Sequence, residues 1–216
     1  GQTHDDFPSL VRAPDGTVWC AYVSYAPGDP VDQQAARNGR FDSLVARNNG
    51  DQIHLARCMS GLWKHEVALT DERRDVWKPS VAVNGTGDVW VVWSENVKGN
   101  WDVYARRYHV KGKQLGGVLR LSTADGPDTN AVAVGGEESV WVAWQGWSGE
   151  SFDIWLTEIR GERVGAPVRV STSEANDWYP SIARAPDGTI WVAWDTYDKG
   201  DYDVYLRAYR DGALHP

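Results

Sequence analysis

The chain contains four copies of one tryptophan-rich pattern, and this repeat restricts the possible fold more than any other feature. The copies read TVWCAY (17–22), DVWVVW (88–93), SVWVAW (139–144) and TIWVAW (189–194). Their first tryptophans lie 71, 51 and 50 residues apart along the chain. A period near 50 residues with several short strands per copy is typical of an array of β-sheet blades. The repeat therefore predicts a β-propeller.

Each copy is predicted to form a four-stranded antiparallel meander. Runs of alternating β-branched and aromatic residues are separated by Pro-Asp-Gly and other glycine-containing turns, which are hairpin signals. In the last copy, Trp191 and Val192 point to opposite faces of the same strand, so both faces are apolar. A sheet that is apolar on both faces needs a neighbour on both faces, and stacked propeller blades supply these neighbours. We therefore expect an all-β fold.

The blade boundaries follow from the spacing of the predicted strands. We expect blades at approximately 7–70, 78–123, 130–172 and 178–216, with each inner strand beginning at a Pro-Ser pair. The first copy carries an insertion (26–50) that is expected to cover the open face of the ring or to contact a neighbouring domain. The last copy is expected to lack its outer strand, which would leave an exposed sheet edge.

Three arrangements are compatible with an incomplete last blade. Residues 1–216 form a single propeller with one short blade, or they are part of a larger propeller, or the open last blade mediates self-association. We favour part of a larger propeller.

The composition restricts the partners of the protein. The net charge is −8, from 30 acidic and 22 basic residues, and nucleic acid is not expected as a partner because its phosphates need a concentrated basic surface. No apolar run approaches the ~20 residues that a membrane span needs, so no membrane insertion is expected. Cys20 and Cys58 are expected to be free thiols, because they lie out of direct register on neighbouring strands.

The repeat resembles that of the TolB-like propellers. The matching segments are 14–16 and 186–188 for the Pro-Asp-Gly turn, 102–104, 153–155 and 203–205 for the third strand, and 120–123 for the fourth strand. This resemblance implies a propeller, usually with six or more blades. It also implies a binding module, a periplasmic scaffold or an accessory domain of a secreted hydrolase. A secreted or periplasmic location is therefore expected.

In a propeller, the loops between the fourth and first strands and those between the second and third strands share the mouth of the central channel. Aromatic rings beside carboxylates at such a mouth suit carbohydrate, because rings stack on sugars and carboxylates accept their hydroxyl hydrogen bonds. The alternative is that the rings pack between blades and the acids are solvated. The predicted ligand-binding residues are Trp77, Trp101, Trp147, Trp178, Tyr197, Tyr202, Glu95, Glu150 and Asp195.

Other repeated polar residues are interpreted as structural. Asp102, Asp153 and Asp203 recur at one strand position, so each is expected to tie a loop to backbone amides of its own blade. Ser9, Ser80 and Ser181 each follow a proline and are likewise expected to be structural. The five histidines show no metal-ligand spacing, and neither a metal site nor a cofactor is expected.

The main functional hypothesis is a non-catalytic propeller module that binds a carbohydrate or a protein partner through the aromatic and acidic loop face, with no catalytic residues. The alternative is a propeller hydrolase or lyase that uses acids at the channel mouth, or the accessory propeller of a larger secreted hydrolase. A third possibility is an assembly scaffold without a small ligand.

Overall fold

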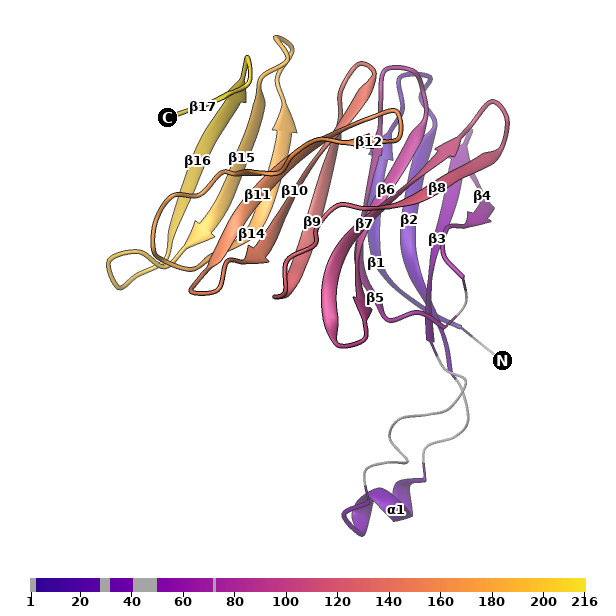
Figure 1. The fold of residues 1–216 in the computed structure, drawn as a ribbon. Helices are drawn as coiled ribbons and strands as arrows, with labels where there is room; N and C mark the ends of the chain where they lie inside the picture. Colours follow the sequence, from indigo (N-terminus) through magenta and orange to yellow (C-terminus); the bar gives the residue numbers. More distant parts are fainter. Residues whose placement is uncertain (1–2, 28–31, 41–49, 72) are drawn as a thin grey trace.

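The computed structural model describes residues 3–27, 32–40, 50–71 and 73–216, which form four antiparallel sheets and one short helix (Figure 1). The first sheet contains β1 (His4–Arg12), β2 (Val18–Ala26), β3 (Gly50–Met59) and β4 (Leu62–Ala68). The second contains β5 (Val76–Val83), β6 (Val89–Val97), β7 (Asn100–His109) and β8 (Gln114–Arg120).

The third sheet contains β9 (Asp128–Gly135), β10 (Ser139–Trp147) and β11 (Phe152–Arg160), and its outer strand is split into β12 (Arg163–Val164) and β13 (Val168–Arg169). The fourth contains β14 (Asp177–Arg184), β15 (Ile190–Thr196), β16 (Asp203–Arg210) and β17 (Ala213–His215). The strands of each sheet pair in chain order. Four such meanders are the blades of a β-propeller, so the predicted fold class is confirmed.

The blades pack face to face in the order of the chain, as Figure 1 shows from indigo to yellow. Within the second blade, Trp93 belongs to the core cluster shared with the first blade, and Trp90 belongs to the cluster shared with the third. A third cluster joins the third and fourth blades. The two tryptophans of the repeated pattern therefore hold the blades together on opposite faces.

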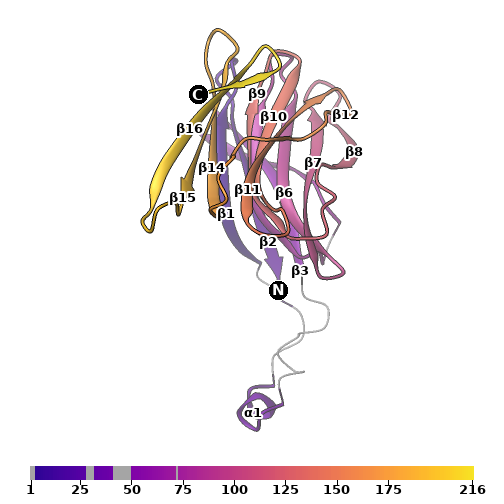
Figure 2. The same ribbon diagram turned by 60° about the vertical axis from the view of Figure 1, so that its left-hand side comes forward.

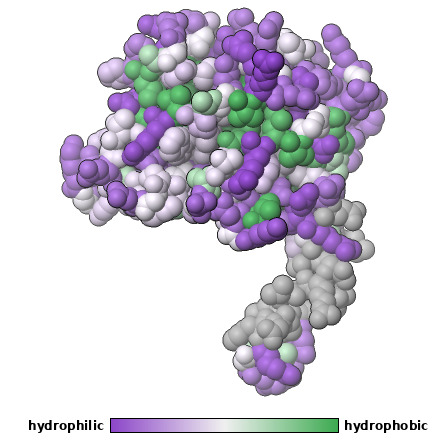
Figure 3. Space-filling model, viewed as in Figure 1, coloured by the Kyte–Doolittle hydropathy of each residue, from purple (hydrophilic) through white to green (hydrophobic). Residues whose placement is uncertain are grey.

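The four blades form an open arc. Among the described residues, no core cluster joins the fourth blade to the first. On the outward face of the fourth blade, Val204 is 73% exposed and Leu206 is 54% exposed. Their counterparts Val103 and Ala105 in the second blade are completely buried against the third. The fourth blade thus presents an apolar face without a neighbouring blade. On the side seen in Figure 3, apolar patches likewise lie among hydrophilic side chains.

Two sequence-based boundaries need correction. The last blade does have an outer strand, because the three residues of β17 pair with β16. The inner strands begin before the Pro-Ser pair: β5 starts at Val76, so Pro79 lies within the strand rather than at its start.

The insertion of the first blade contains α1 (Gln33–Arg37), which is capped by Asp32. Figures 1 and 2 agree that α1 lies beyond the ends of the strands, away from the four sheets. Residues 28–31 and 41–49 of the insertion lie outside the described part of the chain. Within that described part, no helix has the length and apolar character needed to cross a membrane.

Two of the three repeated aspartates join strands rather than capping loops. Asp102 forms an ion pair with Arg120 at 2.8 Å, and Asp153 forms one with Arg169 at 2.6 Å. Each pair ties the third strand of a blade to the fourth through a guanidinium group. The prediction that these aspartates bind backbone amides is therefore wrong. The prediction of free thiols is confirmed, since Cys20 and Cys58 form no disulfide.

The repeated serines join one blade to the next. The Ser9 hydroxyl accepts a hydrogen bond from the backbone N–H of Val81 in the second blade, at 3.1 Å. The Ser80 hydroxyl accepts one from Ala133 in the third blade, also at 3.1 Å. Ser181 is exposed on the fourth blade. Ser9 and Ser80 therefore hold neighbouring inner strands in register.

We predict that Ser80→Ala lowers the free energy of unfolding by about 1 kcal/mol, because it leaves the Ala133 N–H without its acceptor. The matched control Ser181→Ala should change stability by less than about 0.5 kcal/mol, since its hydroxyl faces no following blade. Urea denaturation of both variants measures the difference. Equal losses in the two variants would contradict the inter-blade role.

Candidate functional site

All four inner strands carry a β-bulge at the same position near the channel. On β5 the register passes from Trp77–Ser94 to Ser80–Val92, so Lys78 and Pro79 together oppose a single residue of β6. The inner strands β1, β9 and β14 show register shifts at the corresponding place. A bulge redirects side chains and is common beside active sites.

The first residue of each bulge has a positive φ. The values are 51° for Phe7, 44° for Lys78, 55° for Asn130 and 50° for Tyr179. Positive φ is unfavourable for residues with a side chain, and such strain persists only where the surrounding structure imposes it. Because the positive φ recurs at one position in every blade, it is a regular structural feature of the channel.

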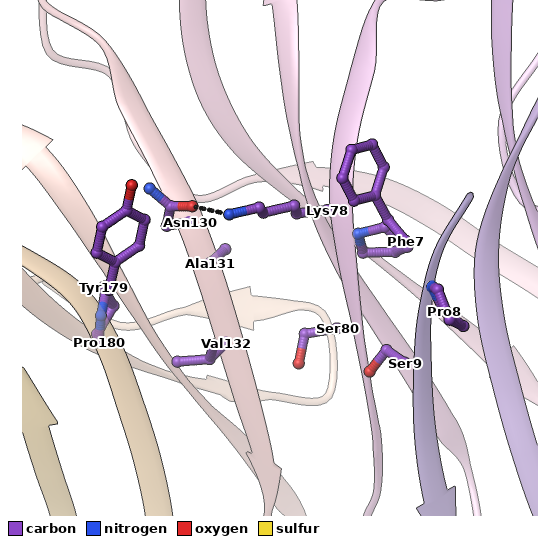
Figure 4. A pocket seen from close by; sticks show the side chains of 11 residues that line it. Phe7, Pro8, Ser9, Lys78, Ser80, Asn130, Ala131, Val132, Tyr179 and Pro180 are labelled. Carbon is purple, nitrogen blue, oxygen red and sulfur yellow. Dashed lines mark hydrogen bonds between the residues drawn. The ribbon is translucent and has the colours of Figure 1, made fainter.

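The four bulges surround a hollow of about 380 Å³ on the channel axis. Figure 4 shows Phe7 and Tyr179 at opposite sides of the hollow, with Lys78 and Asn130 between them. The hydroxyl-bearing residues Ser9 and Ser80 also line it. The hollow therefore combines two aromatic rings, an ammonium group, an amide and hydroxyl groups.

A polar network crosses the channel from the second blade to the fourth. Lys78 Nζ donates to Asn130 Oδ1 at 3.1 Å, and Asn130 Nδ2 donates to Gln145 Oε1 at 3.1 Å. The same Gln145 oxygen lies 3.4 Å from the backbone N of Tyr179. Lys78 Nζ also lies 5.3 Å from the centre of the Tyr179 ring. These contacts fix the positions of the side chains that face the hollow.

The predicted aromatic residues lie at or near strand ends and make ring contacts there. The rings of Trp77 and Trp101 meet edge to face with centroids 6.1 Å apart. Trp178, Tyr197 and Tyr202 gather on the fourth blade, with Tyr202 centroids 5.9 and 5.0 Å from those of the other two. Trp147 pairs with Phe152 at 5.1 Å. None of the six predicted rings lines the hollow itself, and their role in ligand binding stays a prediction.

The three predicted acids have different environments. Glu95 is buried, accepts from Trp93 Nε1 at 3.0 Å and forms an ion pair with Arg74 at 2.9 Å, so its carboxylate is fully engaged. Glu150 is exposed in the turn between β10 and β11. Asp195 is half-buried on β15, and its carboxylate makes no hydrogen bond or ion pair with the described residues.

Sequence reasoning did not identify the residues that line the hollow. Phe7, Lys78, Asn130 and Tyr179 are chemically unlike one another, so no residue type repeats at this position. The available signal was the proline that follows three of them, because proline within a strand is confined to edges and bulges. The third blade lacks that signal, since Ala131 follows Asn130.

No protein-family model matches the chain, and no curated protein sequence matches it. The TolB-like resemblance is therefore not confirmed beyond the propeller fold. Solved structures, in contrast, match nearly the whole chain. A protein of unknown function from Dyadobacter fermentans is 14% identical with a TM-score of 0.64, and the match covers 97% of this chain and 66% of that one.

Several other similar structures have a named activity. The α-L-arabinanase of Penicillium chrysogenum, complexed with arabinobiose, has a TM-score of 0.65 at 10% identity, with 98% of this chain and 62% of that chain covered. The α-L-arabinofuranosidase of Fusarium graminearum, complexed with an iminosugar inhibitor, has a TM-score of 0.66 at 13% identity, with 97% and 65% covered. The chain thus spans about two thirds of the length of these proteins. At this identity the likeness shows the propeller fold.

These comparisons correct the main functional hypothesis. The prediction of a non-catalytic binding module is wrong, because the similar structures with a named activity are glycoside hydrolases. The hydrolase alternative agrees better with them. Their ligands are carbohydrate or a carbohydrate mimic, which is consistent with a carbohydrate partner. No comparison supports a protein partner.

We predict that Lys78→Gly is more stable than Lys78→Ala by about 1 kcal/mol, because both variants lose the side chain but only glycine relieves the positive φ. The opposite order should hold at Ala82, an ordinary strand position, where Ala82→Gly destabilises. Thermal and urea unfolding of the variants measure these differences. If Lys78→Ala proves the more stable of the two variants at that position, the bulge carries no strain.

Proposed function

We propose that this chain forms the channel and the substrate-binding surface of a propeller glycoside hydrolase that acts on arabinose-containing glycans. The observation that carries this proposal is the convergence of the four bulges on one channel hollow. The propeller likeness to an arabinanase and an arabinofuranosidase supports the choice of glycan. The carbohydrate is therefore a substrate in this proposal.

The chemistry of the hollow suits a sugar ring. The Phe7 and Tyr179 rings offer apolar faces, on which the C–H face of a sugar stacks. Lys78 and Asn130 offer donors for hydroxyl oxygens. Because the polar network already fixes these groups, little ordering is needed when the sugar binds.

Hydrolysis of a glycosidic bond normally requires two carboxyl groups that flank the bond. None of the residues that line the hollow has a carboxyl group, so the acids must come from its rim. Asp195 is our first candidate. It follows Trp194 as Gln145 follows Trp144, and Gln145 reaches the channel from this position. The Asp195 carboxylate is also free of partners among the described residues.

Asp6 is our candidate for the second carboxylate. It directly precedes Phe7, a bulge residue of the first blade, and its Oδ1 accepts from the Phe7 N–H at 2.7 Å. Asp6 and Asp195 belong to the first and the last blade. The two acids would therefore approach the channel from the two sides of the opening in the arc.

We further propose that additional blades cover the exposed face of the fourth blade and complete the ring. The exposure of Val204 and Leu206 supports this, as does the greater length of the similar structures. We propose a secreted or periplasmic location, where glycan polymers are accessible to such an enzyme.

The test is hydrolysis of 4-nitrophenyl α-L-arabinofuranoside and of arabino-oligosaccharides. We predict that Asp195→Asn lowers kcat/KM at least 100-fold, since removal of a general acid or base costs about that much or more. Asp6→Asn should have a comparable effect, whereas Glu138→Gln in the exposed turn between β9 and β10 should leave the rate unchanged.

Circular dichroism and the urea midpoint of each variant provide the folding control. A complete lack of hydrolysis by the protein that contains the additional blades would overturn the proposal. Unchanged rates in both aspartate variants would exclude these two acids as the catalytic pair.

A further inference from the structure

An arginine bridges two neighbouring blades in two of the three grooves between blades. In the second blade, Arg106 Nη1 donates to the backbone carbonyl of Leu69 in the first blade at 2.7 Å. Its Nε donates to the Gly116 carbonyl at 2.8 Å. In the fourth blade, Arg207 Nη1 donates to the Val170 carbonyl of the third blade at 2.9 Å.

The third blade has a threonine at this position. In register, Trp93 pairs with Tyr104, and Trp144 pairs with Trp155, so Arg106 and Thr157 both follow two residues later. Thr157 Oγ1 donates to the Gly165 carbonyl at 2.8 Å and so replaces one of the two arginine bonds. The Leu121 carbonyl, which corresponds to that of Leu69, receives no guanidinium from the described residues.

A second arginine is also missing from this groove. Between the first and second blades, Arg74 neutralises the buried carboxylate of Glu95. In the third blade the position of Glu95 is taken by Gly146, and the Asp128 carboxylate occupies the space that a side chain there would need. The position of Arg74 corresponds to Gly126, against which the Trp147 ring packs. The groove therefore keeps an acid but lacks both arginines.

The Asp128 carboxyl group is buried without a cation of its own. The residue is 2% exposed, and Oδ2 has no hydrogen-bond partner among the described residues. Burial raises the pKa of Asp128 to about 6, although hydrogen bonds from Ser122 and Trp144 act in the opposite direction. The neighbouring Arg120 is already paired with Asp102 at 2.8 Å.

Tryptophans form much of the remaining wall. Together with Asp128 and Leu121, the rings of Trp144, Trp147 and Trp155 line a hollow of about 330 Å³. This hollow shares no lining residue with the channel hollow. Aromatic faces attract cations through their negative electrostatic potential, and the attraction is strongest for tryptophan.

We propose that the groove between the second and third blades binds a guanidinium group, such as an arginine side chain, in the place that Arg106 and Arg207 fill in the other grooves. The guanidinium would donate to the Leu121 carbonyl and to the Asp128 carboxylate while it lies against the tryptophan rings. This site is independent of the glycoside hydrolase activity proposed above.

The experiment is a titration of the full chain, followed by the indole N–H signals in ¹⁵N–¹H NMR spectra. The probe is N-acetyl-L-arginine amide, and its neutral analogue N-acetyl-L-citrulline amide has nearly the same shape without the charge. We expect millimolar binding of the arginine probe at pH 7.5 and at least tenfold weaker binding of the citrulline probe. Arabinobiose should leave the signals of Trp144 and Trp155 unchanged.

Two variants test the location. Thr157→Arg should fill the groove from within and abolish binding, whereas Thr157→Ser keeps the bond to Gly165 and should bind as the wild type does. If Thr157→Arg does not fold, Asp128→Asn provides the second test and should weaken binding at least tenfold. The proposal is overturned if no indole signal moves at 50 mM probe, if citrulline binds equally well, if arabinobiose binds instead, or if a folded Thr157→Arg or Asp128→Asn variant retains full affinity.

Discussion

The structure depends on sheets that are apolar on both faces. A strand such as β6 buries Trp90 on one side and Trp93 on the other, so each internal blade must lie between two others. Burial of a large apolar side chain contributes about 1.5–3 kcal/mol, and this contribution is repeated at every blade interface. The same requirement explains why the outward face of the fourth blade is anomalous, because Val204 and Leu206 have the character of interface residues without an interface.

Apolar packing is non-directional, and hydrogen bonds between the blades fix the register of one blade against the next. The hydroxyls of Ser9 and Ser80 each accept an N–H from the next blade, and Arg106 and Arg207 each donate to a carbonyl of the preceding blade. With the inner strands thus aligned, the four bulges lie at one level of the channel. The alignment brings side chains from all four blades to a single hollow, although their residues are far apart in the sequence.

The fold could be predicted from the sequence because the repeated tryptophan pattern indicates strands that are buried on both faces. The channel site could not, since the residue that begins each bulge differs in type from blade to blade. The outer strand β17 was missed for a different reason. Its three residues carry no pattern of their own, and they form a strand only by pairing with β16. The ion pair between Glu95 and Arg74 could not be predicted from the sequence either, because Arg74 lies 21 residues away in the chain.

Comparison between blades was more informative than any single motif. Two blades carry an arginine at the position where the third carries Thr157. Comparison of the hydrogen bonds at this position shows that the Leu121 carbonyl thereby lacks the arginine donor that its counterparts have. A repeat protein allows such comparisons, since a residue in one blade can be compared with the residues at the equivalent position in the other blades.

The central claim is that the bulges build a sugar site on the channel axis. A crystal structure of the protein with a bound arabino-oligosaccharide tests it most directly. The account predicts electron density for a sugar in the hollow, in contact with Tyr179 and Lys78 and within reach of Asp195. A sugar bound only outside the channel, with the hollow occupied by solvent, would contradict it.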